Sequence, residues 1–176
     1  MFHSNLNMFQ KKIKISKQIL IKIEKELITV SKGNKVFNHK VPKSIVLTIN
    51  SNDLILESNN KAMLGLHESI LKRKIQGIIQ NFKKILILNG LGFKVLKENN
   101  QLIFKLGYSH DVIISIPAMI RIELLKANQL ILYSSDWEQL TQFCANLRKL
   151  KKIDPYKGKG ILFKNEQIKL KEGKKK

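Results

Sequence analysis

Three side-chain types of a hydrolytic triad stand together at Ser109, His110 and Asp111. A working triad brings its members together from different elements, whereas consecutive residues do not converge on one point. We therefore interpret this run as a polar loop between strands. Cys144 is the single cysteine and the four histidines show no ligand spacing, so neither a disulfide framework nor a metal site is expected. The place of Cys144 among helically spaced apolar residues predicts that its thiol is packed in the core.

Gly90 and Gly92 form half of a nucleotide-binding glycine pattern. The third glycine is missing, and no Gly-Lys-Ser or Gly-Lys-Thr run is present, so a tight backbone bend at a domain junction is the better interpretation. No carboxylate pair stands out for acid–base chemistry. The sequence thus predicts no enzyme, no cofactor and no small-molecule substrate.

A stronger candidate for binding lies near the C-terminus, after a basic helix end that carries Arg148, Lys149, Lys151 and Lys152. The following segment combines glycines, lysines and a ring at residues 156–160. Its glycines would let backbone N–H groups approach a phosphate, its lysines add charge, and its ring could stack on a base. The members of this segment are Tyr156, Lys157, Gly158, Lys159 and Gly160.

Positive charge is distributed in blocks along the 176 residues, whose formal net charge is +20. Residues 1–44 carry ten basic side chains against two acidic ones, residues 61–97 eight against one, and residues 139–176 twelve against three. The intervening segments are slightly acidic. This alternation favours a polyanionic partner, with nucleic acid first and an anionic membrane surface second. The sequence contains no apolar run of about 18 residues, so no membrane-spanning helix is expected.

An internal repeat indicates two related units. Residues 52–58 and 128–134 are identical at five of seven positions, and the same offset pairs Leu64 with Leu140 and Leu71 with Leu147. The fold class expected is α+β, with two tandem copies of a small unit, each an antiparallel sheet with one helix packed on one face. The predicted boundaries are an N-terminal extension at 1–11, a first domain at 12–84, a second at 85–153 and a basic RNA-binding segment at 154–176.

The elements expected to build these units follow from periodicity. Strands are predicted at 19–23, 46–49, 54–56, 93–96, 102–106, 112–116, 120–125 and 130–132. One helix is predicted at roughly 60–82, and residues 83–92 are expected to join the copies. The second helix has capping-box spacing at Ser135 and Glu138, with Asp136 adding negative charge at its start.

Four runs of residues, in this order, are similar to one known family. They read Leu-Asn-Gly-Leu-Gly-Phe at 88–93, Leu-Gly-Tyr-Ser-His at 106–110, Tyr-Lys-Gly-Lys-Gly-Ile at 156–161 and Lys-Leu-Lys-Glu-Gly-Lys-Lys-Lys at 169–176. Together they resemble the bacterial-type ribosomal protein L-six family of the large ribosomal subunit, over about residues 12–176. The chain departs from the family at Ile153, where proline is frequent, and at Glu68 and Ser69, where glycine and threonine are usual.

The resemblance implies two tandem α+β units, no catalytic activity, and binding to large-subunit rRNA beside neighbouring ribosomal proteins. The family binds near the factor-binding side, close to the sarcin–ricin loop and the stalk base. Carried onto matching positions, it implies RNA contacts first from the 156–160 segment. The next contacts implied are Lys169, Lys171, Lys174, Lys175 and Lys176.

The compartment is predicted from codon-linked composition. Thirty of the 33 basic residues are lysine, and isoleucine and asparagine are abundant, which favours a mitochondrial ribosome in the matrix. A plastid or the bacterial cytoplasm is the alternative, and no arginine-rich transit peptide is visible. For function, the alternatives are a basic RNA-binding protein outside the ribosome and a membrane-surface protein.

Overall fold

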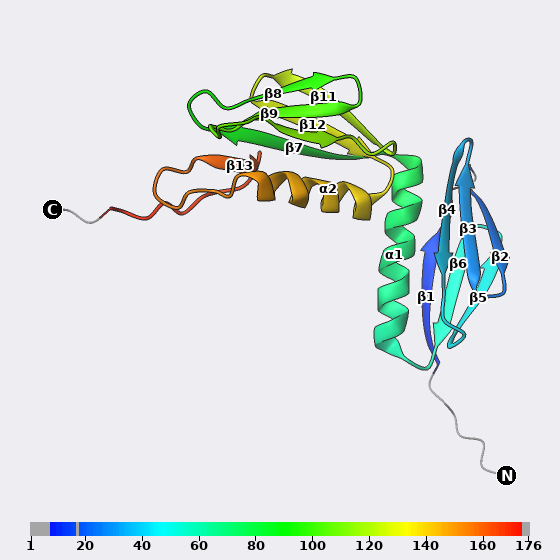
Figure 1. The fold of residues 1–176 in the computed structure, drawn as a ribbon. Coiled ribbons are helices and arrows are strands. Elements are labelled where there is room, and N and C mark those ends of the chain that lie inside the picture. The colour runs from blue at the N-terminus through cyan, green and yellow to red at the C-terminus, as the bar shows by residue number, and fades with distance from the viewer. Residues whose placement is uncertain (1–7, 17, 174–176) are drawn as a thin grey trace, which may run out of the picture. The chain divides into compact units, whose positions relative to one another are not determined.

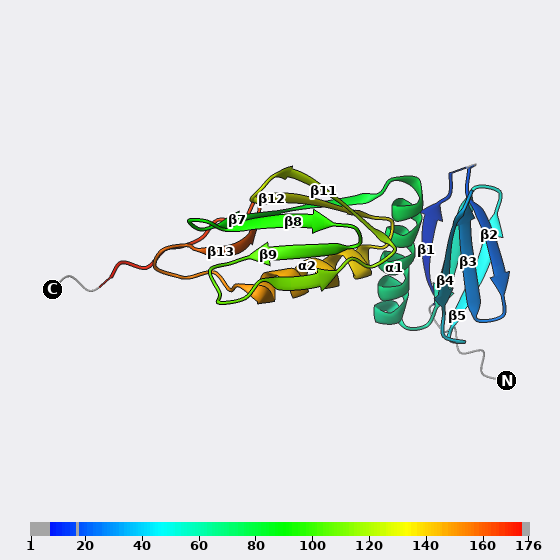
Figure 2. The ribbon, with the colours of Figure 1, turned by 45° about the horizontal axis from the view of Figure 1, so that its top comes forward.

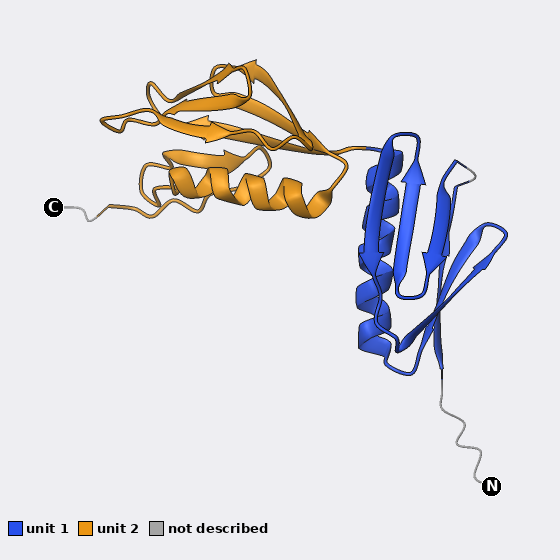
Figure 3. Ribbon diagram, turned by 45° about the vertical axis from the view of Figure 1, so that its right-hand side comes forward, with its two compact units in different colours: residues 1–80 blue, residues 81–176 orange. Residues whose placement is uncertain are grey.

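The computed structural model describes residues 8–16 and 18–173, which form two compact units divided between Gln80 and Asn81 (Figure 3). The first unit contains β1 (Phe9–Lys14), β2 (Leu20–Glu24), β3 (Leu27–Lys32), β4 (Lys35–Lys40), β5 (Ile45–Asn50), β6 (Asp53–Ser58) and α1 (Lys61–Ile79). The second contains β7 (Phe82–Asn89), β8 (Lys94–Glu98), β9 (Gln101–Lys105), β10 (Val112–Ser115), β11 (Ile120–Lys126), β12 (Gln129–Ser134), α2 (Trp137–Leu150) and β13 (Gly160–Phe163).

In the first unit, α1 packs against two antiparallel sheets with the orders β1-β6-β5 and β2-β3-β4 (Figure 1). The helix faces the core with apolar residues at a helical spacing. Its buried apolar side chains are Leu64, Leu71, Ile75 and Ile78, which meet Ile13, Ile28, Val30, Leu54 and Leu56 from the strands. His67 and His39 join the same seam, with a 2.9 Å hydrogen bond between Nδ1 of His67 and Nε2 of His39.

The start and end of α1 have local causes. Asn60 caps the helix because its side-chain oxygen accepts hydrogen bonds from the N–H groups of Ala62 and Met63 at 3.0 and 3.2 Å. The helix ends at Ile79, three residues before the expected end, since Gln80 is already extended and Phe82 begins a strand.

In the second unit, β7 is an inner strand of a four-stranded antiparallel sheet ordered β11-β12-β7-β13 (Figure 2). The sequence suggested that residues 83–92 simply join the two copies. In the structure, most of this segment belongs to β7 and is part of the second unit. Leu86 and Leu88 of β7 are completely buried, while the lysines at 83 and 84 mask the strand pattern in the sequence. A second sheet, ordered β10-β9-β8, and the helix α2 complete this unit.

The N-terminus of α2 also differs from the expected capping box. Asp136, rather than Ser135, caps the helix, because one carboxylate oxygen accepts from the N–H groups of Glu138 and Gln139 at 2.8 and 3.3 Å. The inward side chains of this helix are Leu140, Phe143, Cys144 and Leu147.

The α+β fold class is confirmed, and the repeat has a structural counterpart. β6 and β12, which contain the similar residues, are inner strands in their sheets, share one burial pattern and are each followed by a capped helix. The structure also assigns segments that the sequence had set apart. Residues 9–11 of the expected extension lie in β1, and residues 160–163 of the expected C-terminal segment form β13.

Candidate RNA-binding surface

The segment at 154–160 is a loop, called the glycine loop below, and it is closed by its own hydrogen bonds. The N–H of Asp154 donates to the carbonyl of Lys159 at 2.8 Å, and the N–H of Gly158 donates to the carbonyl of Asp154 at 2.9 Å. The Asp154 carboxylate also accepts from the N–H of Tyr156 at 3.0 Å. These bonds fix the backbone from which the neighbouring side chains project.

The two glycines of this loop face inward. Gly158 has a φ of +67° and Gly160 a φ of +148°, both in the region that disfavours L side chains. A Cβ on Gly160 would lie 2.8 Å from the carbonyl oxygen of Lys152. The Gly158 N–H is used inside the loop instead of being directed at a phosphate. The glycines therefore permit a tight turn against the end of α2.

The remaining members of the loop are exposed. Tyr156 has 56% of its surface accessible, and the side chains of Lys157 and Lys159 face solvent. The chain then turns back over the loop, because the N–H of Lys171 donates to the carbonyl of Pro155 at 2.8 Å. This return places Lys169 and Lys171 in the exposed part of the tail. The predicted contacts Lys174, Lys175 and Lys176 lie outside the described residues.

Two further predicted contacts stand at the end of α2. Lys149 and Lys152 are exposed beside a shallow groove of about 290 Å³. The other residues lining this groove are Ala145, Arg148, Ile153 and Ile161. β13 brings Ile161 to the helix, with the N–H of Ile161 bonded to the carbonyl of Lys151 at 3.1 Å. This bond and the pairing of β13 with β7 hold the start of β13 beside the end of α2. The cations of the helix end and those of the glycine loop therefore belong to the same unit.

Arg148 and Lys151, which were also predicted to contact RNA, make contacts within the protein. The Nη2 of Arg148 lies 2.6 Å from a carboxylate oxygen of Glu166, and its guanidinium lies 4.9 Å from the Phe163 ring centre. The ammonium of Lys151 lies 4.0 Å from the ring centre of Tyr108. Both geometries fit cation–aromatic attraction and hold the helix end to its neighbours.

Two residues that position the surface were missed by sequence reasoning. The side-chain amide of Asn89 donates to the carbonyl of Gly158 at 2.8 Å, and the Tyr108 hydroxyl donates to the carbonyl of Leu150 at 2.9 Å. Asn89 adjoins the Gly90–Gly92 pair, and Tyr108 stands in the Gly-Tyr-Ser-His run. Those runs carried the signal, but nothing in the sequence shows that one meets the loop at 154–160 and the other the end of α2.

The other chemical candidates have structural surroundings. The Ser109 Oγ lies 3.5 Å from the Nδ1 of His110, while the Asp111 carboxylate pairs with Lys105 at 3.4 Å. Burial raises the pKa of Cys144 to about 11. Across residues 8–16 and 18–173, no group of three or more metal-ligating side chains is found. In the same ranges, no helix has the length and apolarity needed to span a membrane.

Comparison with known proteins matches this chain to one family. The family model described as Ribosomal protein L6 matches residues 89–164, which include the glycine loop and α2. The chain is 32% identical over 170 residues to large ribosomal subunit protein uL6 of Caldicellulosiruptor bescii, covering 94% of this chain and 93% of that protein. The chain belongs to the ribosomal protein L6 family.

Other members of the L6 family give the same picture. The protein uL6c of Phaeodactylum tricornutum is 35% identical over 167 residues, covering 92% of this chain and 94% of that protein. The uL6 of Metamycoplasma arthritidis is 36% identical over 129 residues, covering 73% and 70%. The resemblance found in the four runs is therefore confirmed across nearly the whole chain.

Proposed function

We propose that this chain is a structural constituent of the large ribosomal subunit and binds large-subunit rRNA through the C-terminal part of its second unit. The observation that carries the proposal is the rigid glycine loop, from which Lys157 and Lys159 project beside an exposed Tyr156. Membership of the L6 family supports the ribosomal setting.

The proposed mechanism is electrostatic and geometric. Exposed lysines neutralise phosphates and release counterions, and the Tyr156 ring provides a face for stacking on an unpaired base. Lysine is a point charge without the planar fork of arginine. The geometry of RNA binding therefore depends on where the loop holds each ammonium group. Gly158 and Gly160 shape the loop. The primary contacts proposed are Tyr156, Lys157, Lys159, Lys149, Lys152, Lys169 and Lys171, and the further contacts proposed are Lys174, Lys175 and Lys176.

Arg148 and Lys151 are proposed to act at this surface through position. Their charges contribute to the local field, while their contacts with Glu166 and Tyr108 fix the end of α2. From the family resemblance, we propose docking near the sarcin–ricin loop and the stalk base, beside other large-subunit proteins. Hydroxyl-radical footprinting of the rRNA with and without the protein tests that location, and protection confined to another region would refute it.

The first experiment is sucrose-gradient sedimentation of native lysate, followed by a high-salt wash of the large-subunit fraction. A structural component stays with the large subunit through the wash. A protein that binds RNA outside the ribosome, which is the alternative function, appears in lighter RNA-bound fractions instead.

The same gradient addresses the compartment. The lysine, isoleucine and asparagine bias supports the mitochondrial matrix as our proposal, with a plastid or the bacterial cytoplasm as the alternative. Co-sedimentation with mitochondrial large subunits from purified organelles is the result expected. Recovery only with plastid or bacterial ribosomes would overturn it.

A further inference from the structure

The first unit has a groove that the proposed RNA surface does not use. It runs between β1 and the C-terminal half of α1 and has a volume of about 440 Å³. Its main lining residues are Lys12, Lys14, Lys72, Ile75, Gln76 and Ile79. The groove therefore has isoleucines in its floor and lysines on both of the elements that border it.

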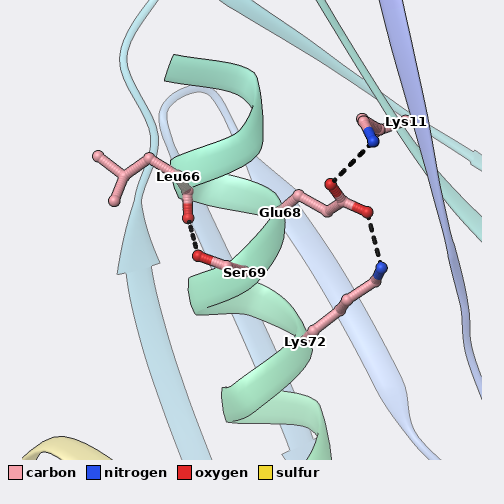
Figure 4. A network of polar contacts seen from close by, with 5 residues as sticks. All are labelled: Lys11, Leu66, Glu68, Ser69 and Lys72. Carbon is pink, nitrogen blue, oxygen red and sulfur yellow. Dashed lines mark hydrogen bonds and ion pairs between the residues drawn. The ribbon is translucent and has the colours of Figure 1, made fainter. Parts of the chain in front are cut away.

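The cation at one end of the groove is held in place by an acidic residue. Glu68 of α1 lies 2.7 Å from the Nζ of Lys72 and 3.6 Å from the Nζ of Lys11 on β1 (Figure 4). Only 14% of the Glu68 side chain is exposed. The hydrogen bond from Lys72 is the largest cause of a lowered pKa at Glu68, which keeps the carboxylate ionised. This network joins β1 to α1 and fixes the distance between the two walls.

The strand wall of the groove is a sheet edge. β1 pairs with β6 on one side only, in the order β1-β6-β5. An edge strand presents unpaired backbone N–H and C=O groups to which an extended chain can add as a further strand.

The alternation of side chains along β1 defines what such a strand would carry. Ile13 is buried towards α1, so Lys12 and Lys14 project from the opposite face of the strand. In an added strand, side chains pointing towards α1 would meet Ile79, which is 49% exposed. Side chains on the other face would lie beside Lys12 and Lys14. An added strand with apolar residues on the first face and acidic residues on the second would match Ile79 of α1 and the two lysines of β1.

The lining is less suited to RNA. Every residue that lines the groove is a lysine, an isoleucine or a glutamine, so the groove offers no aromatic ring for base stacking. A polar sugar–phosphate chain gains no hydrophobic stabilisation from the isoleucine side chains of the floor. An apolar side chain does, because its contact with the isoleucines removes both surfaces from water.

We propose that the β1–α1 groove is a docking site for an extended segment of a partner protein in which acidic and apolar residues alternate. The segment pairs with the edge of β1, directs its apolar residues to Ile79 and places its carboxylates beside Lys12 and Lys14. This site goes beyond rRNA binding and does not depend on it.

The test uses the full chain labelled with ¹⁵N and a capped heptapeptide, Glu-Val-Glu-Val-Glu-Val-Glu. We expect saturable amide shifts confined to β1 and the C-terminal half of α1. A peptide of the same composition with its four glutamates in one block keeps the charge and loses the alternation, and we expect it to bind about tenfold more weakly. Equal binding of the two peptides would reduce the effect to general charge attraction and overturn the proposal.

Two variants separate the contributions of the walls. Lys12→Gln with Lys14→Gln should weaken binding of the alternating peptide about fivefold, because exposed ion pairs contribute modestly. The control, Lys22→Gln with Lys94→Gln, removes the same charge from exposed positions on β2 and β8 and should leave binding unchanged. Ile79→Ala should weaken binding about threefold without opening a core cavity, since Ile79 is half exposed.

Other occupants give distinct results. If a single-stranded RNA oligonucleotide displaces the peptide and shifts the same amides, the groove belongs to the RNA surface and the proposal fails. If the shifts depend on protein concentration without peptide, a second copy occupies the groove and the proposal also fails. Loss of ribosome association after changes in the glycine loop bears on the proposed function alone.

Discussion

Arg148 and Glu166 form a 2.6 Å contact between Nη2 and Oε1 that ties the last turn of α2 to the turn after β13. The second oxygen of Glu166 accepts the N–H of Phe163 at 3.1 Å, and the Arg148 guanidinium lies over the Phe163 ring. One carboxylate therefore joins helix, strand end and turn. Because the glycine loop connects α2 to β13, this contact helps to fix both ends of that loop.

Removing the charge of Glu166 should destabilise the second unit. We expect Glu166→Gln to lower the free energy of unfolding by about 1–2 kcal/mol, because charge-assisted hydrogen bonds at a partly buried site are lost. Urea unfolding followed by Trp137 fluorescence measures it, since Trp137 is the single tryptophan and lies in this unit. Glu123→Gln removes an exposed pair with Arg121 and should cost less than about 0.5 kcal/mol. Equal losses in the two variants would contradict the role given to Glu166.

The glycines of the loop should differ in their tolerance of a methyl group. Gly160→Ala places a Cβ against backbone atoms and should cost about 2–3 kcal/mol in the same assay. Gly158→Ala meets the movable end of Leu170 at 3.3 Å and should cost about 1 kcal/mol. In the interior of α1, Gly65 has open space, and Gly65→Ala should stabilise the first unit by about 0.5–1 kcal/mol. A milder effect at Gly160 than at Gly158 would argue against the close approach to Lys152.

The pair of histidines should make the first unit sensitive to acid. Burial, and after it the charges of Lys74 and His67, lower the pKa of His39 from its ordinary 6.5 to about 4. Burial also lowers the pKa of His67. Between about pH 6.5 and 4 the unfolded chain binds more protons than the folded unit, so stability is complete above pH 6.5 and falls as the pH drops through this window.

Substitution identifies the source of that slope. His39→Gln should flatten the pH dependence of unfolding, whereas His110→Gln, at an exposed position of the second unit, should leave it unchanged. Far-UV circular dichroism reports both units and Trp137 fluorescence reports the second, so their comparison isolates the first. An unchanged slope in His39→Gln would place the acid sensitivity elsewhere.

The glycine loop should determine the salt dependence of RNA binding. We expect Lys157→Glu with Lys159→Glu to lower affinity for large-subunit rRNA in a filter assay at fixed salt, without unfolding the protein. Loss of two phosphate contacts reduces the log–log salt slope by about 1.4–1.8. Lys22→Glu with Lys94→Glu makes the same change in net charge at exposed positions outside the surface. If this control weakens binding equally, net charge rather than the loop explains the affinity.

Cys144 should report opening of the second unit. The thiol is fully buried and its pKa is raised by burial, so the reactive thiolate is scarce in the folded state. We expect iodoacetamide to modify Cys144 only when urea unfolds this unit, with a midpoint equal to that of Trp137 fluorescence. Rapid modification in buffer alone would contradict its packed position.

The sequence by itself determined the two-copy α+β organisation, because apolar periodicity and the repeat at residues 52–58 and 128–134 are local properties of the chain. It also marked the glycine loop, since glycine and proline shape the backbone wherever they occur and the lysines between the glycines add charge. Composition and the four motif runs sufficed to identify the family.

Only the tertiary structure decided which cations are free and which are used internally. Arg148 and Lys149 are adjacent in sequence, yet one is paired with Glu166 and the other faces solvent. The difference arises because β13 pairs with β7 and brings Phe163 and Glu166 to one side of α2. Such pairings join residues far apart in the chain, and their energy depends on the packed neighbours rather than on any local pattern.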